Sequence, residues 1–278
     1  MMKVKVFFRA ALFLGVWSAA ACGPEAETGA VFSKFSTPAG NTPADTLPPA
    51  SGALAQRVSS VSPALPGRDD LTGKFDPAKH PDFVPVGKPY TDKPGMLLRR
   101  EAFEKFKILW AAARKDGLTL KIISSTRTFE QQKNIWERKW ARYAAEIPDA
   151  QARTLKILEY SAMPGTSRHH WGTDIDLNDL NNASFEADGP HADIYTWLRK
   201  NAAAYGFYQP YTAQGANRPQ GYKEEKWHWS YLPLAGPFLR QYAQTTTDAQ
   251  MTGFSGAETA PAIAIVQNYV LGVHPACK

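Results

Sequence analysis

Two short polar segments constrain this chain more than any other part of its sequence. The first is Ser167-Arg168-His169-His170-Trp171-Gly172-Thr173-Asp174-Ile175-Asp176, and the second is Glu225-Lys226-Trp227-His228. Together they offer a metal ion two imidazoles and one carboxylate, those of His169, Asp176 and His228. A catalytic zinc ion takes three such ligands, leaves a fourth position open and needs a base nearby. Any fold that uses this chemistry has to bring the two segments together.

Each segment also indicates its own secondary structure. Alternation over residues 173–177 predicts a strand with its apolar side chains on one face and Asp174 and Asp176 on the other. Residues 227–231 predict a second strand, with His228 on its polar face. Glu225 precedes His228 by an odd number of residues, so a turn at Glu225-Lys226 is needed to bring both side chains to one site.

The rest of the chain mixes helices and strands without a regular βαβ rhythm. A strand is expected over 118–123, where apolar and polar residues alternate. Helices are predicted over 98–115, from Thr128 to about Trp140, from Pro148 to about Tyr160, over 193–205, and over 261–271. This pattern favours the α+β class, with a small, mainly antiparallel sheet flanked by helices.

The first 21 residues predict a signal peptide. Lys3, Lys5 and Arg9 give it a positive start, and residues 10–21 are apolar and end in small side chains. This apolar run is shorter than the about 20 residues that a membrane-spanning helix needs, so export is predicted. These three cations also account for half of the net charge of +6, which weakens any argument for nucleic-acid binding.

Cys22 follows this segment directly, after Ala19-Ala20-Ala21. Small residues before a cysteine resemble the bacterial lipoprotein processing site, so we expect lipidation of Cys22 and attachment to a membrane facing the periplasm or the cell surface. The alternative is an ordinary secretory signal, in which case Cys22 could bridge Cys277 or stay free. Neither cysteine has metal-ligand spacing to the other, which excludes a thiolate zinc site.

Composition divides the remainder of the chain into three parts. Residues 22–70 are rich in Pro, Ala, Ser, Thr and Gly without periodicity, which predicts a flexible tether. Residues 71–254 contain both polar segments and are expected to form the zinc-binding domain. Residues 255–278 are expected to form a helical tail packed on that domain.

The polar segments, with Ser124-Ser125-Thr126-Arg127-Thr128-Phe129-Glu130-Gln131-Gln132 upstream, resemble the VanY-type D-alanyl-D-alanine carboxypeptidases. These belong to the LAS group of zinc peptidases, which includes D-Ala-D-Ala dipeptidases, lysostaphin-like peptidases and the Hedgehog domain. The resemblance covers about residues 75–245. It departs from the family at Asp174, where a small residue is usual, and at Lys226, where proline is common.

The resemblance implies a role for each matching residue. His169, Asp176 and His228 would bind Zn2+, and Glu225 would be the general base. Arg127 would face the scissile carbonyl and stabilise its developing negative charge. Gln132, Ser167 and Trp227 would line the substrate site.

Some assignments stay open from the residues alone. Asp174 is interpreted either as a residue that orients a ligand or steadies Lys226, or as a side chain that faces solvent. His170 is expected outside the ligand set, because its side chain should point away from that of its neighbour His169. Glu224 is the weaker candidate for the base, and iron or manganese could replace zinc.

The function expected from these observations is removal of the terminal D-alanine from peptidoglycan stem peptides by a monomeric, exported enzyme. The alternatives are L,D-carboxypeptidase or endopeptidase action on the same polymer. A module that keeps zinc only for structure and binds the cell wall is a third. No nucleic-acid partner is expected.

Overall fold

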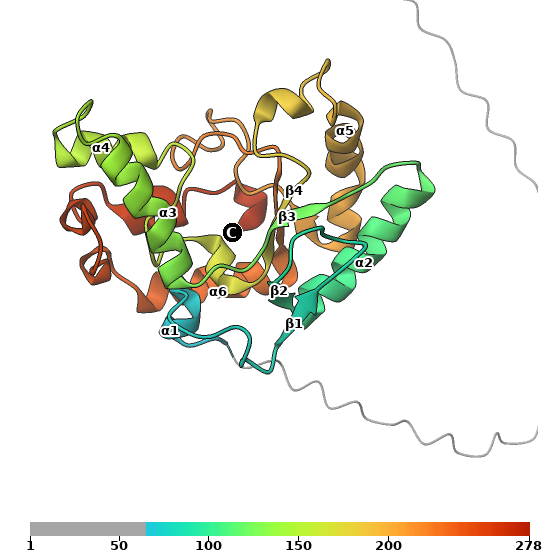
Figure 1. The fold of residues 1–278 in the computed structure, drawn as a ribbon, viewed down its shortest axis with the longest axis horizontal. Helices are drawn as coiled ribbons and strands as arrows, with labels where there is room; N and C mark the ends of the chain where they lie inside the picture. Colours follow the sequence, from blue (N-terminus) through green and yellow to red (C-terminus); the bar gives the residue numbers. More distant parts are fainter. Residues whose placement is uncertain (1–64) are drawn as a thin grey trace, which may run out of the picture. The chain divides into compact units, whose positions relative to one another are not determined.

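Strands β4 (Asp174–Leu177) and β6 (His228–Tyr231) lie at the centre of a four-stranded sheet in the computed structural model, which describes residues 65–278 (Figure 1). The strand order is β3-β4-β6-β5, with β3 at Ile122–Ser124 and β5 at Phe207–Tyr208, and all neighbours are antiparallel. A separate antiparallel pair joins β1 (Phe83–Val86) and β2 (Met96–Arg99). The predicted α+β class with a small antiparallel sheet is confirmed.

The pairing of β4 with β6 joins the two polar segments. Asp176 lies opposite His228 and Asp174 opposite Ser230, while Ile175 lies opposite Trp229. Ile175 and Trp229 are both buried in the apolar core. Because successive side chains of a strand point to opposite faces, core packing on one face fixes the polar residues on the other.

Six α-helices accompany the sheet within the described residues, and most follow the sequence pattern. They are α1 (Arg68–Leu71), α2 (Arg100–Lys115), α3 (Phe129–Arg142), α4 (Ala150–Ile157), α5 (Ala192–Asn201) and α6 (Leu232–Thr245). The predicted capping box is present at the start of α3, where Thr128 and Gln131 satisfy each other's backbone N–H groups. In the view of Figure 1, α3 and α4 lie on one side of β3 and β4, and α2 and α5 lie on the other.

Several elements differ from the sequence prediction. The strand expected over 118–123 is limited to β3, because residues 118–121 form no ladder. The helix expected over 261–271 is a π-helical turn at Val266–Val270 preceded by irregular turns. Strands β1, β2 and β5 and helices α1 and α6 were not anticipated. Helix α6 contains Pro237, which is a helix breaker by propensity.

The predicted signal peptide, the lipidation site at Cys22 and almost all of the predicted tether lie outside the described residues. Helix α1 includes the last three residues of the segment 22–70, and Leu71 at its end is fully buried. Between residues 65 and 278, none of the helices has the length and apolar character required to cross a membrane.

Candidate active site

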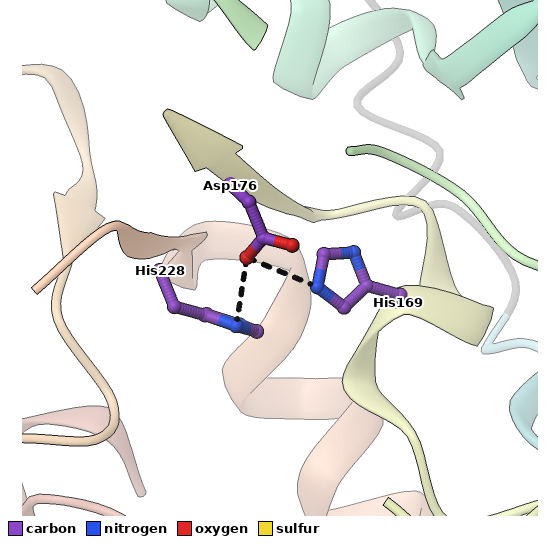
Figure 2. A group of neighbouring side chains, drawn as sticks. All are labelled: His169, Asp176 and His228. Atoms are coloured by element: carbon purple, nitrogen blue, oxygen red, sulfur yellow. Dashed lines mark ion pairs between the residues drawn. The ribbon is translucent and has the colours of Figure 1, made fainter. Parts of the chain in front are cut away.

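The three predicted metal ligands converge from three elements. His169 lies in the 3₁₀ helix Arg168–Trp171, Asp176 in β4 and His228 in β6. The Oδ1 atom of Asp176 lies 3.3 Å from His169 Nε2 and 3.3 Å from His228 Nδ1. Figure 2 shows this carboxylate oxygen between the two imidazole rings. One donor atom from each residue lies within 4.8 Å of the other two, so all three can bind a single ion.

Two of the three donor separations match those around a zinc ion. Two ligands at about 2.0–2.1 Å from a tetrahedral ion lie about 3.3 Å apart, which is the separation of Asp176 Oδ1 from each imidazole nitrogen. Oδ1 is also a buried atom with no hydrogen-bond partner among residues 65–278, although buried carboxylate oxygens are normally satisfied. A cation between the three residues would satisfy it.

Hydrogen bonds to the far ring nitrogens hold both imidazoles. The Nδ1–H group of His169 donates to the Ser125 carbonyl at 2.8 Å, which leaves Nε2 for the ion. The Nε2–H group of His228 donates to Asp174 Oδ1 at 3.0 Å, which leaves Nδ1. Such contacts fix the tautomer and the orientation of a ligating histidine.

Asp174 is therefore an orienting residue and not a solvent-exposed one. It is fully buried, and it also accepts hydrogen bonds from Arg168 Nε at 2.9 Å and from the Thr173 hydroxyl at 2.6 Å. Lys226 lies elsewhere, because its ammonium pairs with Glu186 at 2.6 Å. The expectation that Asp174 faces solvent, and the alternative that it steadies Lys226, were both wrong.

The electrostatics of the ligand set favour charged carboxylates. Burial by itself would raise the pKa of Asp176, but the adjacent His169 and His228 lower it well below its ordinary value. Burial likewise opposes ionisation of Asp174, but Arg168, His228 and Thr173 together outweigh it, so the pKa of Asp174 is also lowered. Both carboxylates are consequently ionised at neutral pH.

Glu225 lies beside this set and has a different pKa. Its Oε2 atom is 3.3 Å from His228 Nδ1. A turn precedes β6, with His228 N donating to the Glu225 carbonyl at 3.3 Å, as the odd spacing required. Burial raises the pKa of Glu225, and the adjacent imidazole of His228 only partly opposes this. Glu224 does not line the cleft, and its carboxylate is instead 3.5 Å from the hydroxyl of Tyr195.

Arg127 enters the site from the segment between β3 and α3. Its Nη1 atom donates to Ser124 Oγ at 2.7 Å and lies 3.9 Å from Asp176 Oδ2. Its Nη2 atom reaches Ser167 Oγ at 3.5 Å, and the buried Nε has no partner among residues 65–278. Burial lowers its pKa, although nearby carboxylates oppose the effect. The guanidinium thus retains unused donor capacity next to the ligand set.

A cleft of about 320 Å³ joins these groups to the remaining predicted residues. Gln132, Ser167 and Trp227 all line it. Gln132 donates from Nε2 to the Ala162 carbonyl at 2.7 Å, whereas its buried Oε1 has no partner among the described residues. The structure therefore brings all eight predicted site residues within the domain to one cleft.

The cleft also contains residues that the sequence did not single out. These are Ile135, Lys139, Tyr160, Ser161, Ala162, Arg168, Leu180, Tyr211 and Tyr222. Arg168 is the largest omission, since it is fully buried and holds Asp174. A charged residue in a turn is ordinarily exposed, so the sequence did not predict that Arg168 is buried. Its position next to His169 was the only indication of a role in the site.

His170 lies outside the ligand set, as expected. Its Nδ1–H donates to the Arg127 carbonyl at 2.7 Å, and its Nε2 accepts from Gly165 N at 3.2 Å. Burial lowers the pKa of this imidazole to about 3, so it is neutral at physiological pH. His170 holds the backbone that presents Arg127.

Gly172 connects the 3₁₀ helix to β4. Its φ of +71° lies in the left-handed region, and an added Cβ would come within 2.3 Å of the Phe83 ring. Both features require glycine. Gly172 therefore lets the chain turn from His169 into the strand that carries Asp176.

An α+β fold with buried histidine, aspartate and histidine donors defines the chain as a metal-binding domain. Residues 95–234, half of the chain, match the VanY family, described as D-alanyl-D-alanine carboxypeptidase. The chain belongs to this family, which confirms the resemblance inferred from the motifs.

Individual proteins and solved structures are similar to parts of this chain. A D-alanyl-D-alanine carboxypeptidase of Enterococcus faecalis (strain ATCC 700802 / V583) is 34% identical over 130 residues, 45% of each chain. The solved structure of VanYB in complex with D-alanine-D-alanine is 27% identical, with a TM-score of 0.43 over 58% of this chain and 87% of that chain. A Zn(II) complex of the vancomycin resistance D,D-pentapeptidase VanY is also 27% identical, with a TM-score of 0.42 over 63% and 92%. The chain spans slightly less than half the length of the curated relatives it matches first.

We predict that His228→Ala abolishes stoichiometric metal binding, because it removes one of three protein ligands. The unsubstituted domain, stripped with a chelator and refilled, should contain one equivalent of zinc by elemental analysis. His191→Ala changes a histidine outside the cleft and should leave the zinc content unchanged. Full zinc retention by His228→Ala would contradict the ligand assignment.

Asp174→Asn should lower zinc affinity about 10- to 100-fold, as loss of a hydrogen-bond partner behind a metal ligand typically does. It should also destabilise the fold by about 3–5 kcal/mol, since it leaves the charge of Arg168 buried without its partner. Chelator competition and chemical unfolding measure the two effects. Asp92→Asn removes only the surface pair with Lys121 and should change neither quantity.

Proposed function

We propose that this chain is a zinc-dependent carboxypeptidase that removes the terminal D-alanine from peptidoglycan stem peptides. The observation that supports it most directly is the joint placement of the His169, Asp176 and His228 donors with Glu225 and Arg127 in one cleft. A site that holds zinc only for structure has no need of a buried base or of an arginine with unused donors. Membership of the VanY family supports the same reaction class.

Glu225 supplies the proton transfer in this proposal. When bound, zinc polarises a carbonyl group and makes a water molecule a competent nucleophile near neutral pH. The Oε2 atom of Glu225, 3.3 Å from the ligand atom of His228, is close enough to take a proton from an attacking water. Burial raises the pKa of Glu225, which makes its carboxylate a better acceptor for that proton, and the protonated carboxyl then passes the proton to the departing amine.

Arg127 stabilises the negative charge that develops on the substrate carbonyl in this proposal. Attack on an amide carbonyl places negative charge on its oxygen, and a fixed donor in a water-poor cleft stabilises that charge. The Arg127 guanidinium is held by Ser124 and Ser167 and keeps an unpartnered Nε–H. It therefore needs little reorganisation as the charge develops.

Three further residues are placed to hold the peptide. The unpartnered Oε1 of Gln132 can accept a hydrogen bond from a peptide N–H group, and Ser167 offers a hydroxyl group beside Arg127. Trp227 lines the cleft with Tyr160, whose ring centroid is 6.3 Å from its own. These contacts can orient a short peptide with its last amide bond at the metal.

Glu225→Gln should retain zinc and the fold but lose about 10²- to 10⁴-fold in turnover, because the amide cannot accept the proton. Release of D-alanine from purified muropeptides, followed by mass analysis, measures both the rate and the bond cleaved. Glu224→Gln is the matched control and should remain active. Near-normal turnover of Glu225→Gln would transfer the role of base to another residue, and a different mass loss would indicate L,D-carboxypeptidase or endopeptidase action.

We also propose that the enzyme is exported and anchored in the cell envelope through Cys22. This rests on the positive and apolar start of the sequence and on the small residues before the cysteine. Two acyl chains on one residue would give firm attachment, since a single chain binds a membrane only marginally.

Cys22→Ser should convert the protein from a form extracted only with detergent into a soluble one. Mass spectrometry of the mature N-terminus measures the modification directly. An unmodified Cys22 in the native protein, whether free or bridged to Cys277, would contradict the anchor and favour a soluble secreted enzyme.

A further inference from the structure

Lys139 places an ammonium group on the wall of the cleft. It lies in the last turn of α3, and its Nζ donates to Ser161 Oγ at 2.5 Å. Both side chains line the cleft together with Tyr160 and Trp227. The hydroxyl of Ser161 holds the ammonium in place without neutralising it.

Lys139 differs from the other two cations of the cleft in its partners. Arg168 pairs with Asp174 at 2.9 Å, and Arg127 lies 3.9 Å from Asp176. Of the ion pairs formed within residues 65–278, none involves Lys139. It is therefore the cleft cation that has no carboxylate within 4.0 Å in this part of the chain.

The surroundings of Lys139 favour an incoming anion. Burial lowers its pKa, and Glu225 only partly opposes this. The positive charges of Arg142 and Arg127 lower it further. A partly desolvated ammonium among other cations gains more from an added carboxylate than an exposed lysine does.

We propose that Lys139 determines substrate specificity by binding a carboxylate group of the stem peptide. The inference rests on the proposed function, whose substrate carries a free carboxylate at its end. Arg127, next to the metal ligands, would contact the reacting carbonyl, whereas Lys139 would bind a group that does not react. The carboxylate is either the terminal one or one carried by a side chain of the stem, and both make the same charge-assisted hydrogen bond.

The test compares peptides that differ in one carboxylate. Zinc-loaded Glu225→Gln protein is titrated calorimetrically with diacetyl-L-lysyl-D-alanyl-D-alanine, with its C-terminal amide, and with an analogue that has a carboxylate on the third residue from the end. Adding Lys139→Met should weaken binding of the free acid roughly 10- to 100-fold, the range for a hydrogen bond to a charged group. It should change binding of the amide much less, and Lys139→Arg should restore most of the affinity.

Lys133→Met is the matched control, since it removes a lysine of the same helix that does not line the cleft. If Lys139→Met weakens binding only of the analogue with the side-chain carboxylate, the proposal is supported and that carboxylate, instead of the terminal one, is the group bound by Lys139. Equal affinities of the Lys139→Met and parent proteins for both the acid and the side-chain carboxylate analogue, or equal losses for the acid, the amide and the analogue, would overturn it. Release of D-alanine by the protein with Glu225 intact tests the proposed function separately. In the same active background, an unchanged KM of Lys139→Met would refute only the role of Lys139.

Discussion

The antiparallel pairing of β4 with β6 is the constraint on which the site depends. It places Asp176 directly opposite His228, where Cβ atoms of facing residues lie about 4.5–5.5 Å apart. A slip of one residue would turn Asp174 and Asp176 toward the apolar core. Ile175 prevents this because it is fully buried on the other face of the strand. The hydrophobic core thus sets the register, and the register brings the metal ligands together.

The buried charges of the site explain why it suits a cation. Asp174, Asp176 and Glu225 are three carboxylates with almost no exposed surface, and Arg127 and Arg168 are the two nearby guanidinium groups. Removing each charge from water costs several kcal/mol unless the charges compensate one another. The pair of Arg168 with Asp174 does so, whereas the nearest guanidinium nitrogen to Asp176, that of Arg127, is 3.9 Å away. A cation bound directly by Asp176 would compensate its charge more closely.

Sequence periodicity predicted the parts of the site that depend on local geometry. Alternation put Asp174 and Asp176 on one strand face, and the odd spacing of Glu225 and His228 required the turn that the structure contains. The sequence could not identify the Ser125 carbonyl that orients His169, because a backbone oxygen leaves no residue-specific signal.

Long-range contacts explain the remaining omissions. Arg168 is buried only because Asp174 and Ser230, the latter from a distant strand, surround its guanidinium. Helix α6 was missed because Gly236 and Pro237 disfavour a helix by propensity. Packing in the core maintains the helix, through the buried side chains of Leu234, Ala235, Phe238 and Leu239.

Helix α3 forms one wall of the cleft, to which it contributes Gln132, Ile135 and Lys139. Its capping box begins one residue after Arg127, so the start of the helix is fixed close to the reacting groups. Gln132 and Lys139 are seven residues apart, which places them on one face of the helix, about 10 Å from each other along its axis. An extended peptide covers that distance in about three residues. Under the proposed function, one helix would contact several consecutive residues of a stem peptide, while His169, Asp176 and His228 would act on a single bond near its end.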